Sequence, residues 1–226
     1  MTPTQTAAAH AAGRHRARRD SAGFTLVEFT MAMGIFMFVI AVSLSGVAYM
    51  SRDVVKTTNL STSTDQIRQA FTRLDREVRY ASEINTPALK GSIWYLEFQG
   101  LNSTGVDTCF QWRVDTTTDK LQTRRWAAST TTIPTTWSTV ASNVANDTTS
   151  AQAPFTFTAA DNQFKFQVLD VMLIGKRGTS NTSALTLSTS MTARNSSVGS
   201  TTNNDSDGDG VLNTTCHDST GTVNRP

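Results

Sequence analysis

Residues 23–50 read GFTLVEFTMAMGIFMFVIAVSLSGVAYM, and this stretch decides how the chain is organised. No charge occurs in the 22 positions from 29 to 50. As an α-helix, that run would span about 33 Å, enough to cross the hydrocarbon core of a membrane. Arginines precede the run and none lies inside it, so the positive-inside rule predicts a cytoplasmic N-terminus and an extracytoplasmic remainder. The stretch therefore predicts a single-pass membrane protein.

Two simpler interpretations of the apolar run are a cleaved secretory signal peptide and an inert signal anchor. A signal peptide has an apolar region of about 7 to 15 residues, followed by small residues at the cleavage site. Here the run is longer, and Ser51-Arg52-Asp53 follows it. Glu28 argues against an inert anchor, because an ionised carboxylate within a span is costly and indicates a function and a partner.

The composition of the chain argues against a nucleic-acid partner and against an enzyme. The formal net charge of +2 arises in residues 1–23, which carry four arginines and one aspartate, so the remainder has a net charge of −1. His217 is the one histidine outside this leader, which leaves too few imidazoles for a histidine-rich zinc site. No P-loop, dinucleotide fingerprint or zinc-protease motif occurs. We expect no catalytic residues and no enzymatic activity.

The hexapeptide GFTLVE at residues 23–28 carries a resemblance to a known family. After a basic leader and before a long apolar helix, it resembles the prepilin signature of type IV pilins and type II secretion pseudopilins. The resemblance implies that a prepilin peptidase cuts after Gly23 and that the new N-terminal residue, Phe24, is N-methylated. It also implies that Glu28 acts in filament assembly.

The same resemblance implies partners and a location. The partners are other pilin or pseudopilin subunits, the prepilin peptidase, the inner-membrane assembly platform and, before assembly, membrane lipid. The subunit would reach the filament or the cell surface after assembly. Protein secretion, DNA uptake, adhesion and motility all stay open as purposes of such a filament, and so does the choice between a major and a minor subunit.

Cleavage of the leader has a direct electrostatic consequence at Phe24. Before the cut, this residue carries an amide, and after the cut it carries an ammonium that Glu28 of a neighbouring helix can pair with. Desolvating either charge alone is costly, and pairing offsets much of that cost. A head-to-tail contact of this kind that does not close produces a helical filament. We therefore expect leader removal to permit assembly.

Beyond the span, the residue pattern predicts an α+β fold. Apolar residues recur at helical spacing from Ile67 to Ala81, which predicts an amphipathic helix. Alternating and β-branched residues then predict strands at 93–99, 108–114, 120–126, 155–158, 163–172 and 184–193. The Thr-rich residues 129–149 are predicted to form a long surface loop.

The expected architecture is a long N-terminal helix, membrane-spanning in its first half and amphipathic in its second, packed on an antiparallel β-sheet domain. The expected parts are a cleaved basic leader (1–23), a transmembrane and assembly helix (24–50), its amphipathic continuation (51–86), a β-rich globular domain (87–200) and an acidic C-terminal loop or tail (201–226). A weaker similarity to J-type minor pseudopilins, in Trp137 with VASNV at 140–144 and TARN at 192–195, favours a minor subunit.

An acidic run, NNDSDGDGVLN at residues 203–213, resembles the calcium loops of EF-hands, dockerins and thrombospondin type 3 repeats. Carboxylates at alternate positions before a glycine suit a cation that takes six to eight oxygen ligands. Position 12 of the loop is Cys216 rather than an acid, so the loop is incomplete, and a solvated acidic tail is the alternative. The expected calcium ligands are Asp205, Asp207, Asp209, the carbonyl of Val211, and Asn213.

Cys109 and Cys216 are the two cysteines of the chain. Both fall on the oxidising side of the membrane in the expected topology, which favours a disulfide between them, although their separation in space cannot be taken from the sequence. The alternative to a filament subunit is a monomeric, signal-anchored extracellular binding domain stabilised by calcium. A mature N-terminus at Phe24 would separate the two hypotheses.

Overall fold

The computed structural model describes residues 23–130, 132–176, 183–206, 210–218 and 221–226. Within these residues one long helix, α1 (Leu26–Arg79), is followed by strands β1 to β9 and two short 3-10 helices, Ser150–Gln152 and Thr201–Asn203. The chain divides into two units, Met1–Tyr49 and Met50–Pro226, and α1 contributes to both. The predicted leader, 1–23, lies outside the described residues except for Gly23.

The N-terminal part of α1 is long and apolar enough to cross a membrane. Within the segment Leu26–Val55, an 18-residue window has a mean hydropathy of 2.2, and the large apolar side chains of the segment are exposed. Two hydroxyls in it are satisfied by the helix itself, because Thr30 Oγ1 donates to the Val27 carbonyl at 2.9 Å and Ser45 Oγ to the Ala41 carbonyl at 2.8 Å. The prediction of a helix this long and this apolar is confirmed. The predicted orientation of the helix in a membrane stays a prediction.

The C-terminal end of α1 differs from the expected one. The helix stops at Arg79, and Ala81–Ile84 forms strand β1, so residues 81–86 are not a continuation of the helix. Ala81 is buried as the helical spacing suggested, but it is buried in a strand that pairs with β3. A Cβ on the paired Gly100 would lie 2.8 Å from the Tyr80 carbonyl oxygen. The backbone between α1 and β1 can therefore lie this close to position 100 only because glycine has no side chain.

Two antiparallel sheets form the β-rich part, where the sequence predicted one. The first has the order β1-β3-β4-β5-β6, with β2 paired to β3, and the second has the order β7-β8-β9. Strand β6 falls within the predicted loop 129–149, and β8 starts at Gln167 rather than at 163. The remaining bounds are β2 Ala88–Lys90, β3 Ile93–Leu101, β4 Asp107–Asp115, β5 Lys120–Ala127, β6 Ser138–Ser142, β7 Phe155–Thr158, β8 Gln167–Lys176 and β9 Ser183–Ala193.

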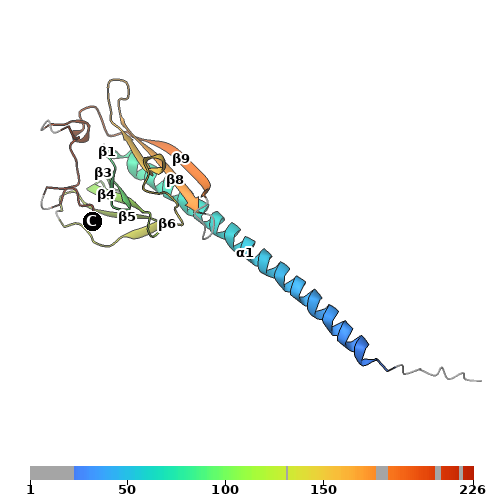
Figure 1. The fold of residues 1–226 in the computed structure, drawn as a ribbon. Coiled ribbons are helices and arrows are strands. Elements are labelled where there is room, and N and C mark those ends of the chain that lie inside the picture. Colours follow the sequence, from blue (N-terminus) through green and yellow to red (C-terminus); the bar gives the residue numbers. More distant parts are fainter. Residues whose placement is uncertain (1–22, 131, 177–182, 207–209, 219–220) are drawn as a thin grey trace, which may run out of the picture. The chain divides into compact units, whose positions relative to one another are not determined.

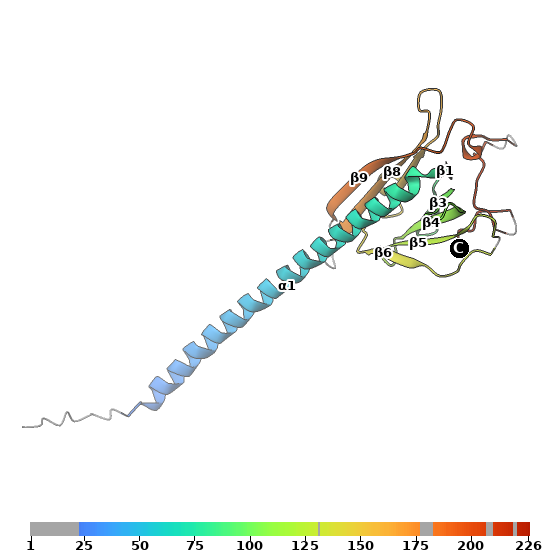
Figure 2. The same ribbon diagram turned by 180° about the vertical axis from the view of Figure 1, so that it is seen from behind.

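One hydrophobic core joins the second half of α1 to both sheets. Both sheets lie beside this half of the helix (Figure 1, Figure 2). The predicted helical stripe supplies Ile67, Leu74 and Val78, which are at most 1% exposed. Fully burying one aliphatic side chain contributes about 1.5 to 3 kcal/mol, so this stripe is a main source of stability for the unit. The core residues from the sheets include Leu96, Phe98, Phe110, Trp112, Val114 and Leu121 from the first, and Phe155, Leu169, Val171, Leu173, Met191 and Ala193 from the second.

Candidate functional site

The first candidate site is the start of α1, where the residues of the prepilin-like motif lie. Gly23 and Phe24 precede the helix, and Phe24 is 81% exposed. Thr25 caps the helix, because its carbonyl accepts the Phe29 N–H at 3.1 Å and its hydroxyl accepts the Glu28 N–H at 3.3 Å. The cap places Glu28 in the first helical turn, exposed.

This geometry gives Glu28 a local role that the sequence analysis missed. A carboxylate in the first turn complements the positive end of the helix dipole, which is worth roughly 0.3 to 1 kcal/mol at an exposed position. The signal was present in the sequence, since threonine at 25 and glutamate at 28 have the spacing of a capping box. Any test of Glu28 in assembly therefore needs two variants that both keep a polar side chain at position 28, one with the negative charge and one without it.

The apolar helix that follows has no polar face. Its large apolar side chains are exposed, from Leu26 at 81% to Ile40 at 36%, and they point in every direction around the axis. A helix that is apolar all round is stable only when lipid or other helices cover it. The segment can thus hold the chain in a membrane or pack against helices of other molecules.

The acidic loop is described only in part. Two of the five expected calcium ligands, Asp207 and Asp209, lie outside the described residues. Among the residues that are described, Asp205 Oδ2 accepts the Gly210 N–H at 2.8 Å, and the Asn204 carbonyl accepts the Asn213 N–H at 2.9 Å.

The described ends of the loop fit the register of a calcium loop. Gly210 stands at position 6, where the EF-hand requires a sharp turn, and it has φ +82°. Val211 is 62% exposed at position 7. Over the ranges that the structure describes, no group of three or more His, Cys, Asp or Glu residues could hold a metal ion. Calcium binding therefore stays a prediction.

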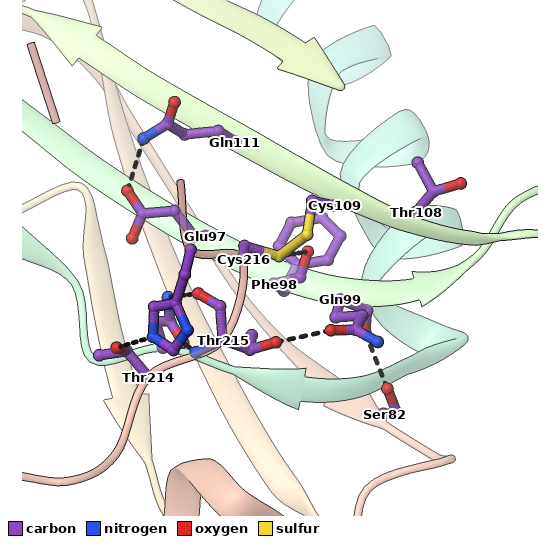
Figure 3. The surroundings of a disulfide bond; sticks show 12 residues. Ser82, Glu97, Phe98, Gln99, Thr108, Cys109, Gln111, Thr214, Thr215 and Cys216 are labelled. Carbon is purple, nitrogen blue, oxygen red and sulfur yellow. Dashed lines mark hydrogen bonds between the residues drawn. A yellow bond between two sulfur atoms is a disulfide. The ribbon is translucent and has the colours of Figure 1, made fainter. Parts of the chain in front are cut away.

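The two cysteines form a disulfide that ties the C-terminal segment to β4. Cys109 and Cys216 have their Cα atoms 5.6 Å apart and are separated by 107 positions (Figure 3). Asn85 and Thr215 hold the same segment, since the Asn85 Nδ2 donates to the Thr215 carbonyl at 2.9 Å and the Thr215 N–H donates to Asn85 Oδ1 at 2.7 Å. The segment after the acidic loop is thus fixed by a covalent bond and by several hydrogen bonds, among them a third from Thr215 Oγ1 to Gln99 Oε1 at 2.6 Å.

Part of the face of the first sheet that points away from the core is polar and yet buried, beside the apolar cluster of Cys109, Trp126 and Cys216. Glu97 and Gln111 are both 0% exposed on this face, and Gln111 Nε2 donates to Glu97 Oε1 at 2.8 Å (Figure 3). Arg225 covers them, with its Nη2 2.6 Å from Glu97 Oε2 and its Nε 3.1 Å from Oε1. A buried carboxylate needs a partner of this kind, because the charge has lost its water.

A second part of the cover comes from Trp137. The guanidinium carbons of Arg113 and Arg124 lie 3.9 Å and 4.3 Å from the centroid of its ring, an arrangement that permits cation–π attraction. Arg124 Nε also donates to Gln111 Oε1 at 2.6 Å. Burial, with the neighbouring charge of Arg113, lowers the pKa of Arg124 to about 10, so the group stays cationic at neutral pH.

Sequence reasoning missed this network. The alternation in β3 places Glu97 on the other face of the strand from Leu96 and Phe98, and such a pattern predicts that Glu97 faces solvent. It does not predict that Arg225, 128 positions away, covers Glu97. The structure thus brings together Cys109 with Cys216 and Glu97 with Arg225, and it places the prepilin-like residues at the start of the apolar helix. Comparisons of the chain with protein-family models, with curated proteins and with solved structures gave no match.

Proposed function

We propose that the chain is a structural subunit of a type IV pilus-like or pseudopilus filament, processed by a prepilin peptidase and assembled through its N-terminal helix. The observation that carries the proposal is GFTLVE at residues 23–28, placed directly before a helix whose large apolar side chains are exposed. Lipid covers this helix before assembly, and helices of neighbouring subunits cover it afterwards.

The charge pattern of the helix supports the proposal. Glu28 is the one charged residue from Phe24 to Met50. In a bundle of apolar helices its carboxylate requires a cation, and the ammonium created at Phe24 by cleavage is the nearest chemical candidate in an adjoining copy. The pairing fixes an axial offset between subunits, which a filament needs.

The disulfide supports an extracytoplasmic β-rich part. Disulfides persist in oxidising compartments and are rare in the cytosol, so the Cys109–Cys216 bond agrees with a cytoplasmic N-terminus and a domain outside the membrane. Calcium in the acidic loop would add a second restraint to the same region, since extracellular modules function with weak calcium sites. The β-rich part then decorates the filament, as a minor subunit of the J type would.

The proposal is tested by comparing Glu28→Gln with Glu28→Asp. Both variants keep a polar side chain in the first turn of α1, and only the aspartate keeps the charge. Each is produced in a strain that makes the filament, and the subunit is measured in the sheared filament fraction and in the membrane. We expect leader cleavage in both, filament incorporation in Glu28→Asp, and a loss of at least tenfold in Glu28→Gln.

Equal incorporation of the two variants would contradict the pairing of Glu28 with a neighbouring ammonium. An uncut chain that is anchored and monomeric would favour a signal-anchored binding domain instead.

A further inference from the structure

A pocket lies at the C-terminal end of α1, within the unit Met50–Pro226. Its volume is about 530 Å³, in the range of about 300 to 1,000 Å³ that small ligands occupy in proteins. The last turns of α1, the turn between β3 and β4, and strand β5 supply its walls. The lining residues used below are Arg76, Glu77, Tyr80, Leu101, Asn102 and Arg125.

Two arginines give this pocket a positive charge that the protein does not neutralise. Arg76 and Arg125 are exposed, and within the described residues neither guanidinium has a salt bridge or hydrogen bond. Glu77, the one carboxylate in the lining, is already engaged. Its Oε1 accepts from Arg73 Nε at 2.9 Å, and its Oε2 accepts from Trp112 Nε1 at 2.9 Å.

Helix capping does not explain both arginines. A cation in the last turn of a helix complements the helix dipole, which gives Arg76 a structural reason. Two carbonyls at this end are already partnered, however, since Arg79 O accepts the Arg194 N–H at 3.1 Å and Tyr80 O accepts the Asn195 amide at 3.2 Å. Arg125 belongs to β5 and has no such role.

The rest of the lining is preorganised and amphipathic. Asn102 Oδ1 accepts the N–H groups of Thr104 and Val106 at 2.9 Å and 3.0 Å, which fixes the turn between β3 and β4. A fixed loop loses little conformational freedom when it binds a ligand. Tyr80 and Leu101, 55% and 48% exposed, add an aromatic and an apolar surface beside these polar groups.

We propose that this pocket, called the Arg76–Arg125 pocket, binds an anionic sugar unit of an acidic polysaccharide. The guanidinium groups suit a carboxylate or a sulfate, which they bind with charge-assisted hydrogen bonds. The exposed ring of Tyr80 suits the C–H face of a sugar, and the polar turn suits its hydroxyls. A nucleic-acid backbone fits less well, because Arg73 and Arg79 on the same helix pair with Glu77 and Asp75 and leave no continuous positive track. This inference is independent of filament formation.

The test uses the full chain in non-ionic detergent micelles. Binding is measured to immobilised polygalacturonate, which carries carboxylates, to dextran sulfate, which carries sulfates alone, and to neutral dextran. We expect binding to at least one acidic polymer and none to dextran, and the preferred polymer identifies the anionic group. Arg76→Ala combined with Arg125→Ala should weaken binding at least tenfold. Tyr80→Ala should weaken it several-fold without any change in charge.

Arg68→Ala is the matched control, because Arg68 is exposed on the same helix and does not line the pocket. It should bind as the parent does, and near-ultraviolet circular dichroism shows that each variant is folded. The proposal is overturned if Arg68→Ala loses as much binding as the double variant, because the polymer would then bind by non-specific attraction to the positive charges on the surface. It is equally overturned if the parent binds neither acidic polymer, or binds DNA more tightly than both.

Discussion

Replacing Arg225 by alanine should lower the free energy of unfolding of the β-rich unit by about 3 kcal/mol, because it strips a buried carboxylate of its cation. Glu97 is 0% exposed, and Arg225 reaches it with three nitrogen–oxygen contacts of 2.6, 3.1 and 3.2 Å. After the substitution, the protein would offer Glu97 one neutral donor, Gln111 Nε2 at 2.8 Å. Breaking a buried pair by removing one partner costs roughly 3 to 5 kcal/mol. The lower end applies because the Arg225 side chain is itself 19% exposed, so water can enter where it was.

A second substitution reverses part of this loss. Glu97→Gln in the Arg225→Ala background removes the charge that needs compensation and keeps a polar side chain beside Gln111. The double variant should therefore be more stable than Arg225→Ala alone by about 1 to 2 kcal/mol, since an unpaired buried amide costs less than an unpaired buried charge. A second mutation in a core that raises stability is an uncommon result, and packing losses alone do not produce it.

Urea unfolding of the full chain in detergent micelles, followed by near-ultraviolet circular dichroism, measures these differences. The tryptophans report on the unit, because Trp112 is fully buried and Trp126 is 6% exposed. The reasoning is refuted if Arg225→Ala unfolds with the parent's midpoint, or if the double variant is less stable than the single one. Arg225→Lys is the matched control, since it keeps the charge, and it should lose less than Arg225→Ala.

Three further predictions concern the rest of the β-rich part. Cys109→Ser with Cys216→Ser should cost about 4 kcal/mol, because the bond closes a loop of 107 positions, and the urea midpoint of the oxidised parent is the comparison. Millimolar calcium should raise the melting temperature, and Asp207→Ala should abolish the increase; an equal shift in both chains would argue against the loop. Burial raises the pKa of Asp115, but hydrogen bonds from Thr118 and Thr117 and the charge of Arg113 together bring that pKa below its ordinary value. The stability this provides is present above about pH 4 and is lost as the pH falls through the lowered pKa, so Asp115→Asn should lose less stability than the parent on acidification to about pH 2.

The sequence was sufficient for the helix and for most of the strands, because their patterns are local. The absence of charge from 29 to 50 and the helical spacing of Ile67, Leu74 and Val78 need no knowledge of the rest of the fold. The same spacing predicted a helix that is too long, because Ala81 fits the helical spacing although it lies in strand β1. What ends the helix is the pairing of β1 with β3 across Gly100, a contact between distant segments.

The covered polar face could not be predicted for the same reason. Glu97 and Gln111 have the period of solvent-facing strand residues, and nothing near them in the sequence indicates that Arg225 will cover them. The cysteines gave a partial signal, because pairing Cys109 with Cys216 implies that the C-terminal segment lies against β4. The prepilin-like motif is the opposite case, since its chemistry is carried by six consecutive residues.

The most direct test of the filament hypothesis is the N-terminal residue of the protein extracted from membranes of cells that produce it. Peptide mapping by mass spectrometry reports both the position of the cut and the state of the new amine. The account predicts a chain that begins at Phe24 and carries an N-methyl group. A chain that retains residues before Gly23, or one that begins after Met50, would contradict it.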